Sequence, residues 1–350
     1  MGNLLTVCIP FKNEGDEVTK TVKSVRDTAG YNVDIVVLDD VSDDGYEYET
    51  NLKPYNVKFF KSETRMGSSL GKEFCVQQAT TPYVFLLDAH SRIYTKDWLD
   101  KAIKLLESEE AKNTIYCCLC QYFTDDTDHM DPKHVKAYGG YFDYNIKSLF
   151  SVAWNTKNFA SDLESPFDII AILGANYLVR KDYWDYLGGY KGLKLYGREE
   201  AFISIKSILS GGNVKCYPGI HTGHKARPSS KQPYLCYAYE VVHNEMVTAY
   251  ICCPEKFERL MKCWRSLYRT NESVYIMAKD EFYRDIDKLT ELQEEFQKIK
   301  KVDYNYLDLR NADFQRKVGF NYNALKDKIK GTYPKYIPEI NIAEPTFPIG

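Results

Sequence analysis

The chain has 350 residues, 44% of them hydrophobic and 14% aromatic, and its formal net charge at pH 7 is -3. A chain of this length and composition can bury a sizeable core, which predicts one large α/β domain with an appendage, or two domains. The nearly balanced charge excludes a globally basic surface, so a polyanionic partner would have to meet a local patch.

The N-terminus and the cysteines bear on the compartment. Residues 1–10 are too few for a secretory signal and lack its basic region, and no apolar run reaches the roughly 18 residues of a membrane span. The ten cysteines include Cys117-Cys118-Leu-Cys120 and Cys252-Cys253, but neither cluster has the second pair that a zinc site needs. We therefore predict reduced, mostly buried thiols, no membrane span and a cytoplasmic location.

The first 90 residues alternate buried strands with helices. Strands are predicted over 4–9, where Pro10 closes the first of them, and over 33–38, 57–61 and 84–87; helices are predicted around Val18 to Val25 and over 69–79. This order predicts a parallel, doubly wound nucleotide-binding half. No G-x-G-x-x-G follows the first strand and no P-loop pattern occurs, which argues against a dinucleotide site or a P-loop.

Acidic side chains follow two of these predicted strands. The strand over 33–38 ends in Asp39-Asp40, and the strand over 84–87 ends in Asp88-Ala89-His90. Parallel sheets bind ligands at the carboxyl ends of their strands, so these side chains are expected at the mouth of a site. In extended chain Asp88 and His90 point the same way and could together hold a divalent cation. The alternative is a strand cap followed by a surface histidine.

The remaining elements are less regular. The predicted segments are a helix over 96–109, a strand over 114–123, a charged loop over 125–136, an aromatic antiparallel region over 139–154, a strand over 169–179 broken at Gly174-Ala175, a helix over 199–209, a strand over 214–217, helices over 237–250, 255–268 and 280–301, and an extended end over 333–350. Beyond residue 228, Arg and Lys interleave with aromatic residues. This pattern marks either a nucleic-acid or sugar surface or solvated helices packed on the main domain.

Several of these segments carry recognisable motifs, which occur in the order Ile9-Pro-Phe-Lys-Asn13-Glu14, Val37-Leu-Asp39-Asp40, Leu86-Leu-Asp88-Ala89-His90, Gly139-Gly140-Tyr-Phe-Asp143, Leu173-Gly-Ala-Asn with Leu187-Gly-Gly-Tyr190, Tyr196-Gly-Arg-Glu199-Glu200, Gly223-His224-Lys-Ala-Arg227 and Glu240-Val-Val-His-Asn-Glu245. Together they resemble the GT-A glycosyltransferases, and specifically the polypeptide N-acetylgalactosaminyltransferases with their D-x-H metal motif. The resemblance implies an α/β fold with a Rossmann-like, mostly parallel sheet and helices on both faces, followed by a mainly helical extension. The expected division is a catalytic domain over 1–250, with a nucleotide-binding half over 1–125 and an acceptor half over 126–250, and an extension over 251–350.

The same resemblance implies the ligands. It indicates a UDP-sugar donor and Mn²⁺ (or Mg²⁺) bound by Asp88, His90 and His224, the cation neutralising charge on the departing UDP. His221 is an alternative ligand that the Gly-His spacing disfavours. Among the expected nucleotide-sugar-binding residues, Asp40 matches an acid that contacts uracil in the family, and Lys72 stands where the family has an arginine. The other expected binding residues are Pro10, Lys12, Glu14, Arg65, Asp88, Ala89, Gly174 and Arg227.

Glu199 and Glu200 are the catalytic candidates of the acceptor half. A carboxylate must deprotonate the acceptor hydroxyl if transfer inverts the anomeric centre. At this place related inverting enzymes have the pair E-D, and the retaining N-acetylgalactosaminyltransferases have the pair E-N. This chain has Glu199-Glu200 and matches neither. In addition, Arg198 replaces the second glycine of the family's W-G-G-E-N motif. The sugar, the stereochemistry and the acceptor therefore stay open.

The sequence thus predicts a metal-dependent glycosyltransferase that moves a hexosyl or N-acetylhexosaminyl group from a UDP-sugar to a hydroxyl of a protein or saccharide. One alternative is transfer onto a hydroxymethylated base in DNA. A second is a catalytically silent nucleotide-sugar-binding module, since the fold alone permits it. The combination of Asp88, His90, His224 and Glu199 argues against the silent module. Neither a membrane anchor nor the repeated Q-x-W of a lectin domain is seen, which again favours a cytoplasmic location.

Overall fold

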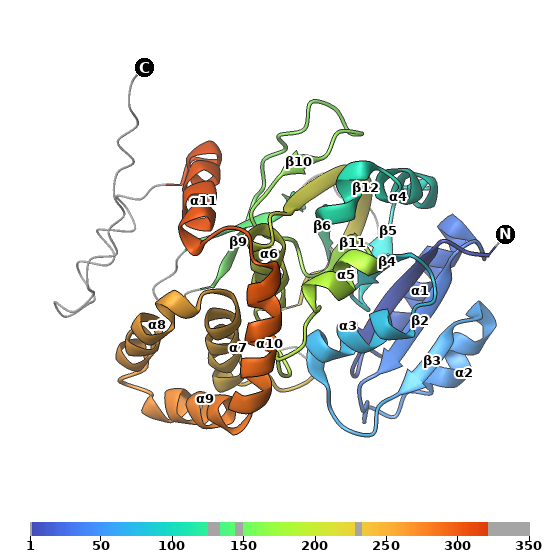
Figure 1. Cartoon of the computed structure of the whole chain (residues 1–350). Coiled ribbons are helices and arrows are strands. Elements are labelled where there is room, and N and C mark those ends of the chain that lie inside the picture. The colour runs from blue at the N-terminus through green and yellow to red at the C-terminus, as the bar shows by residue number, and fades with distance from the viewer. Residues whose placement is uncertain (1, 125–133, 144–149, 228–232, 321–350) are drawn as a thin grey trace, which may run out of the picture.

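The computed structural model describes residues 2–124, 134–143, 150–227 and 233–320 (Figure 1). A ten-stranded sheet has the order β10-β12-β6-β11-β4-β1-β2-β3, with β5 paired to β12 and β7 paired to β6. The strands are β1 (Leu5–Phe11), β2 (Asp34–Asp39), β3 (Lys58–Lys61), β4 (Tyr83–Leu87), β5 (Ser91–Ile93), β6 (Thr114–Phe123), β7 (Lys136–Ala137), β8 (Gly140–Phe142), β9 (Val152–Trp154), β10 (Phe167–Asp168), β11 (Asn176–Arg180) and β12 (Asn213–Lys225). Strands β8 and β9 form a separate antiparallel pair.

Helices cover both faces of the sheet and continue beyond it. They are α1 (Asp16–Ala29), α2 (Tyr48–Leu52), α3 (Gly67–Gln78), α4 (Trp98–Leu106), α5 (Lys181–Leu187), α6 (Glu199–Leu209), α7 (Ala238–Cys252), α8 (Pro254–Leu267), α9 (Glu272–Arg284), α10 (Ile286–Ile299) and α11 (Tyr304–Val318), with short 3₁₀ turns at Lys53–Tyr55 and Glu109–Asn113. In Figure 1, helices α7 to α10 gather at the end of the molecule opposite β2 and β3.

Continuous apolar sequence places β1, β2 and β4 inside the molecule. All five residues of β4 are buried, and β1 pairs in parallel with both β2 and β4. Successive side chains of a strand point to opposite faces. Accordingly Leu5, Val7 and Ile9 pack with α1, α2 and α4, whereas Cys8 packs with α3 in the layer on the other side. The α/β prediction, a mostly parallel sheet with helices on both faces and a helical C-terminal region, is confirmed.

The C-terminal helices do not have a core of their own. Their buried side chains, including Trp264 of α8, Phe282 of α9 and Phe296 of α10, belong to the same apolar cluster as α3, α5 and α6. The predicted boundary near residue 250 stays a prediction, because burial is continuous across it.

Several local predictions were wrong. Of the strand predicted over 169–179, only the part from Asn176 onward is a strand, β11. β1 continues through Pro10 to Phe11; its pairing with β4 ends at Cys8, so the missing N–H of proline is tolerated at this end. The segment 280–301 is not one helix, because the chain turns at Asp285 and both α9 and α10 pack on α7. The strand over 214–217 extends to Lys225 with an irregularity after Tyr217.

A further difference concerns the metal motif: Asp88 and Ala89-His90 lie in the connection between β4 and β5 and not in extended chain. Helix α11 was also missed, because its buried face includes the polar side chains of Asn311 and Gln315, which hydrogen-bond to the backbone of Phe142.

The remaining expectations concern termini, thiols and the membrane. Residues 125–133 of the predicted charged loop, residues 144–149 of the aromatic region and the predicted extended end over 333–350 lie outside the described residues. All ten cysteines are free thiols, and all but Cys236 and Cys263 are buried. Among the described residues, no helix has both the length and the apolar character to cross a membrane.

Candidate active site

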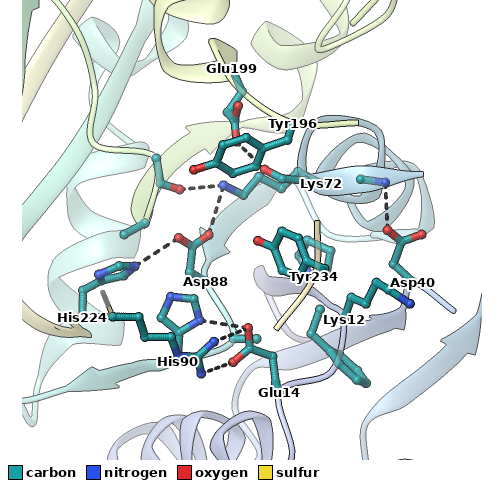
Figure 2. A pocket seen from close by; sticks show the side chains of 18 of the residues that line it. Lys12, Glu14, Asp40, Lys72, Asp88, His90, Tyr196, Glu199, His224 and Tyr234 are labelled. Carbon is teal, nitrogen blue, oxygen red and sulfur yellow. Dashed lines mark hydrogen bonds and ion pairs between the residues drawn. The ribbon is translucent and has the colours of Figure 1, made fainter. Parts of the chain in front are cut away.

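One cavity of about 240 Å³ lies where β1, β2 and β4 end. The chain leaves β1 at Lys12 and Glu14, β2 at Asp40 and β4 at Asp88, so parallel strand ends supply one wall. Apart from the alternative ligand His221, every candidate site residue from the sequence lines this cavity: Pro10, Lys12, Glu14, Asp40, Arg65, Lys72, Asp88, Ala89, His90, Gly174, Glu199, Glu200, His224 and Arg227. Figure 2 shows Glu199 facing this wall across Lys72 and Tyr196.

The three expected metal ligands come together although His224 is far from the other two in sequence. One ligand atom from each of Asp88, His90 and His224 lies within 4.8 Å of the others. His224 is on β12, which pairs with β5 next to the turn that carries Asp88 and His90, so the sheet sets the three side chains against each other. The Nε2 atom of His224 is 3.4 Å from Oδ2 of Asp88.

Glu14 orients the second imidazole. Its Oε1 lies 3.2 Å from Nδ1 of His90, and both carboxylate oxygens also accept from the guanidinium of Arg227. With Nδ1 donating to Glu14, the Nε2 atom of His90 has the free lone pair that a metal requires. Burial would raise the pKa of Glu14, but His90 and Arg227 lower it below its usual range, so the carboxylate stays ionised.

The protonation states suit a cation. Burial would raise the pKa of Asp88, yet Lys72 and His224 hold it well below its usual value. Burial also lowers the pKa of His224, more than Asp88 raises it, so its imidazole is neutral at pH 7. A carboxylate oxygen together with two imidazole nitrogens is a donor set for a borderline transition metal such as Mn²⁺. The residues present therefore fit the implied metal.

Lys72 connects the two walls of the cavity. Its Nζ lies 3.1 Å from Oδ1 of Asp88 and donates to the carbonyl oxygen of Gly174 at 2.7 Å. Burial would lower the pKa of Lys72, but the carboxylates of Asp88, Glu199 and Glu200 raise it, so the buried ammonium stays charged. A fixed positive charge therefore stands beside the expected metal.

Asp40 joins the end of β2 to the start of α3. Its Oδ1 accepts from the backbone N–H of Met66 at 2.6 Å and its Oδ2 from that of Gly67 at 2.8 Å. Its neighbour Asp39 caps the strand end by accepting from the N–H of Ser42 at 2.7 Å. Each carboxylate oxygen of Asp40 keeps a second lone pair for a ligand.

Glu199 and Glu200 form the opposite wall, in the first turn of α6. The hydroxyl of Ser68 donates to Oε1 of Glu199, whereas the buried Oε2 has no hydrogen-bond partner among the described residues. The carboxylate of Glu200 packs on Gly174, where an added Cβ would approach Oε1 to 2.5 Å. Burial and the adjacent Glu199 carboxylate raise the pKa of Glu200.

Other lining residues were not predicted from the sequence. Tyr196, Tyr234 and Trp154 bring aromatic surface to the cavity. The ring of Trp154 stacks on Tyr122 at 4.9 Å, and the guanidinium of Arg65 lies 5.5 Å from the ring centre of Tyr234. The aromatic richness over 139–154 indicated Trp154, and Tyr196 stands in the motif that carries Glu199 and Glu200. Tyr234 meets the cavity through tertiary contacts alone.

Comparison with known proteins shows what this chain is similar to. Residues 6–172 match the model of glycosyl transferase family 2. A probable N-acetylgalactosaminyltransferase 6 of Caenorhabditis elegans is 25% identical over 241 residues, which cover 65% of this chain and 38% of that protein. Polypeptide N-acetylgalactosaminyltransferase 10 of Mus musculus is 27% identical over 229 residues, covering 63% of this chain and 37% of that protein. The chain thus spans well under half of the length of these relatives.

The fold comparison agrees. A crystal structure of GalNAc-T7 with UDP, GalNAc and Mn²⁺ has a TM-score of 0.62 and 18% sequence identity to this chain, and the match covers 95% of this chain and 58% of that one. The resemblance to GT-A enzymes of the N-acetylgalactosaminyltransferase type is confirmed: residues 6–172 match the glycosyl transferase family 2 model, and the similar relatives and the similar fold agree with that match.

Proposed function

We propose that this protein is a metal-dependent glycosyltransferase that moves a sugar from a UDP-sugar to an acceptor hydroxyl. The observation that carries the proposal is the convergence of Asp88, His90 and His224 in a cavity whose other wall holds Glu199. A nucleotide-binding module would need neither the complete ligand set nor the second wall. The similar fold of GalNAc-T7, whose crystal structure contains UDP and Mn²⁺, supports this ligand pair.

Each side chain then has a task. A bound Mn²⁺ would act as a Lewis acid toward the departing UDP. Asp88, His90 and His224 would hold it, and Glu14 keeps the imidazole of His90 oriented for binding. The ammonium of Lys72, fixed between Asp88 and Gly174, stabilises negative charge as the sugar–phosphate bond breaks. Asp40 lies on the other side of the cavity from His224 (Figure 2), where it can accept the N3–H of uracil.

Glu199 is the group that meets the acceptor. Its Oε2 is buried and unpartnered among the described residues, so it can accept the proton of an acceptor hydroxyl that enters the cavity. Burial and the adjacent Glu199 raise the pKa of Glu200 to about 7, so partial protonation of Glu200 reduces the repulsion between the two neighbouring carboxylates. Because its Oε2 is unpartnered among the described residues, we assign general-base catalysis to Glu199 in a transfer that inverts the anomeric centre.

The donor sugar and the acceptor are the finer parts of the proposal. The names of the relatives favour an N-acetylhexosamine as the sugar and a polypeptide hydroxyl as the acceptor, with a saccharide hydroxyl as the other acceptor to test. Transfer onto DNA has no support among these relatives. A cytoplasmic location remains a prediction that fits the free thiols.

A donor screen tests the proposal. Release of UDP is measured with UDP-N-acetylgalactosamine, UDP-N-acetylglucosamine, UDP-galactose and UDP-glucose, with Mn²⁺ and with a chelator. We expect release from at least one donor, and only with the metal. Donor-induced thermal stabilisation without any UDP release would instead identify a silent module.

A substitution at the second wall tests the assignment of the base. Glu199→Gln removes the proton acceptor while it keeps the side-chain shape, and we expect kcat for transfer to fall about 100-fold. The KM for the donor is measured in the same assay. A fall in donor affinity with an unchanged kcat would contradict the role of Glu199 as a base.

A further inference from the structure

The segment 194–198, which leads into α6 and its two glutamates, has an unusual backbone. Leu195 has φ 45°, Gly197 has φ 99° and Arg198 has φ 70°. Left-handed conformations of non-glycine residues cost free energy and persist only where surrounding structure imposes them. Arg198 lies directly before Glu199, so its backbone sets the direction in which α6 starts.

Helix α7 holds this segment through two adjacent side chains. The amide of Asn244 accepts from the N–H of Lys194 at 2.9 Å and donates to the carbonyl oxygens of Lys194, Tyr196 and Gly197. It is completely buried, as is nearly all of the Glu245 side chain. An amide that binds the backbone at these places leaves the segment little freedom.

Glu245 holds the last residue of the segment. Its Oε1 accepts from Nε of Arg198 at 2.8 Å, and its Oε2 accepts from Nε1 of Trp264 at 2.7 Å. Trp264 belongs to α8 and is fully buried. A chain of contacts therefore runs from α8 through Glu245 to Arg198, and ends one residue before Glu199.

We propose that the helical C-terminal region positions the catalytic wall, with Arg198 as the positioning residue and Glu245 and Trp264 as its anchor. Glycine, which the related motif has here, would tolerate the left-handed backbone without help; arginine adopts it because its guanidinium is bound. The inference rests on the proposed function, since it takes Glu199 as the residue to be positioned. It assigns the helices beyond residue 250 a role in turnover.

The first test replaces the anchor. Glu245→Gln keeps the size of the side chain but removes the charge that binds Arg198. Misplacement of a reacting group by about 1 Å can reduce turnover by about 100-fold, so we expect kcat to fall about 10- to 100-fold with little change in donor KM. Lys256→Gln is the matched control, because it removes the ion pair with Asp308 and leaves the segment 194–198 untouched.

The second test uses the backbone. Arg198→Ala keeps a Cβ in the left-handed region and loses the guanidinium, and we expect it to lower kcat more than Arg198→Gly does. In the Glu245→Gln background, Arg198→Gly should restore part of the lost kcat, because glycine accepts φ 70° without an anchor. A role in stability alone predicts instead that kcat follows the melting temperature in all variants, including Lys256→Gln, and this result would overturn the proposal.

Amide hydrogen exchange of the protein without donor separates this inference from the proposed function. We expect exchange over residues 195–200 to become at least about tenfold faster in Glu245→Gln and to remain unchanged in Lys256→Gln. Unchanged exchange in Glu245→Gln would refute the positioning role, whatever the enzyme does. If exchange is faster in this variant but the wild-type protein transfers no sugar, the proposed function is refuted. The conclusion that Glu245 restrains the segment 194–198 would still stand.

Discussion

The two walls of the cavity are built in different ways. The wall that carries Lys12, Asp40 and Asp88 consists of the ends of parallel strands, each held in register by ladder hydrogen bonds to its neighbours. The wall that carries Glu199 and Glu200 follows a segment with left-handed residues, held by side chains from α7. Regular pairing makes the first wall rigid by itself, whereas the second depends on helices that are remote in sequence.

This difference predicts how each wall responds to change. Substitutions in the strand-end wall should act on metal and donor binding. Substitutions around the second wall should act on turnover and on the packing that joins the two walls. The following predictions test this contrast, in order of decreasing expected effect.

His224→Ala removes one metal ligand from the first wall. We expect metal-dependent UDP release to fall by about 10³-fold or more, because the remaining carboxylate and imidazole leave the cation underligated. His221→Ala is the matched control: His221 is on the same strand but packs against the ring of Tyr94 and does not line the cavity. Both variants are measured by UDP release and by Mn²⁺ titration. Equal losses in the two variants would contradict the assignment of His224 as a metal ligand.

Gly67→Ala acts where the walls meet. Gly67 has φ +76°, and an added Cβ would lie 2.1 Å from the backbone oxygen of Leu195. We expect the free energy of unfolding to fall by about 3–4 kcal/mol, measured by denaturant titration. Gly45→Ala, at the same φ but with no atom within 4 Å, should cost only about 1 kcal/mol. Similar losses would mean that the contact between Gly67 and Leu195 does not form.

Glu17→Gln tests the support of the first wall by pH, because Glu17, on α1, accepts from Lys225, which lines the cavity. Burial would raise the pKa of Glu17, but hydrogen bonds from Lys225 and Arg92 lower it to about 2. A lowered folded-state pKa stabilises the protein above the unfolded-state value, and this stability is lost as the pH falls toward 2. Unfolding at pH 7 should therefore show a loss of about 2–3 kcal/mol for the variant, and the difference from wild type should shrink between about pH 4.5 and pH 2. A difference independent of pH would exclude the ion pairs as its cause.

Glu200→Gln tests the second wall through a carboxyl group whose pKa is raised, whereas the pKa of Glu17 is lowered. Burial and Glu199 raise the pKa of Glu200, so ionised Glu200 is more costly in the folded protein than in the unfolded chain. Wild type should lose stability as the pH rises from the unfolded-state value through the folded one. At about pH 8 the free energy of unfolding of the variant should therefore exceed that of wild type by about 1 kcal/mol. At about pH 4 this difference should be smaller. Thermal unfolding of the variant and of wild type across this pH range measures the difference. A variant less stable than wild type at the higher pH would contradict the raised pKa of Glu200.

The contrast also explains how far the sequence could be interpreted. Apolar runs that end in Asp40 and in Asp88-Ala89-His90 predicted the strands, the sheet edge and the candidate residues on it, because a parallel sheet collects its strand ends on one side. His224 was nominated by a family motif, since nothing local connects it with Asp88. The sequence predicted extended chain where the structure has the turn that carries the D-x-H motif. So short a connection between strands gives no periodic signal.

Tertiary structure decided the rest. The partners of Glu14, the position of Lys72 between two carboxylate-bearing walls and the aromatic lining by Tyr196 and Tyr234 arise from contacts between distant segments. The break between α9 and α10 and the hold of α7 on the segment 194–198 have the same origin. Hydrophobic patterning determines which strands and helices form, whereas the left-handed backbone at Arg198 lies in a segment that Asn244 and Glu245, on another helix, contact through hydrogen bonds.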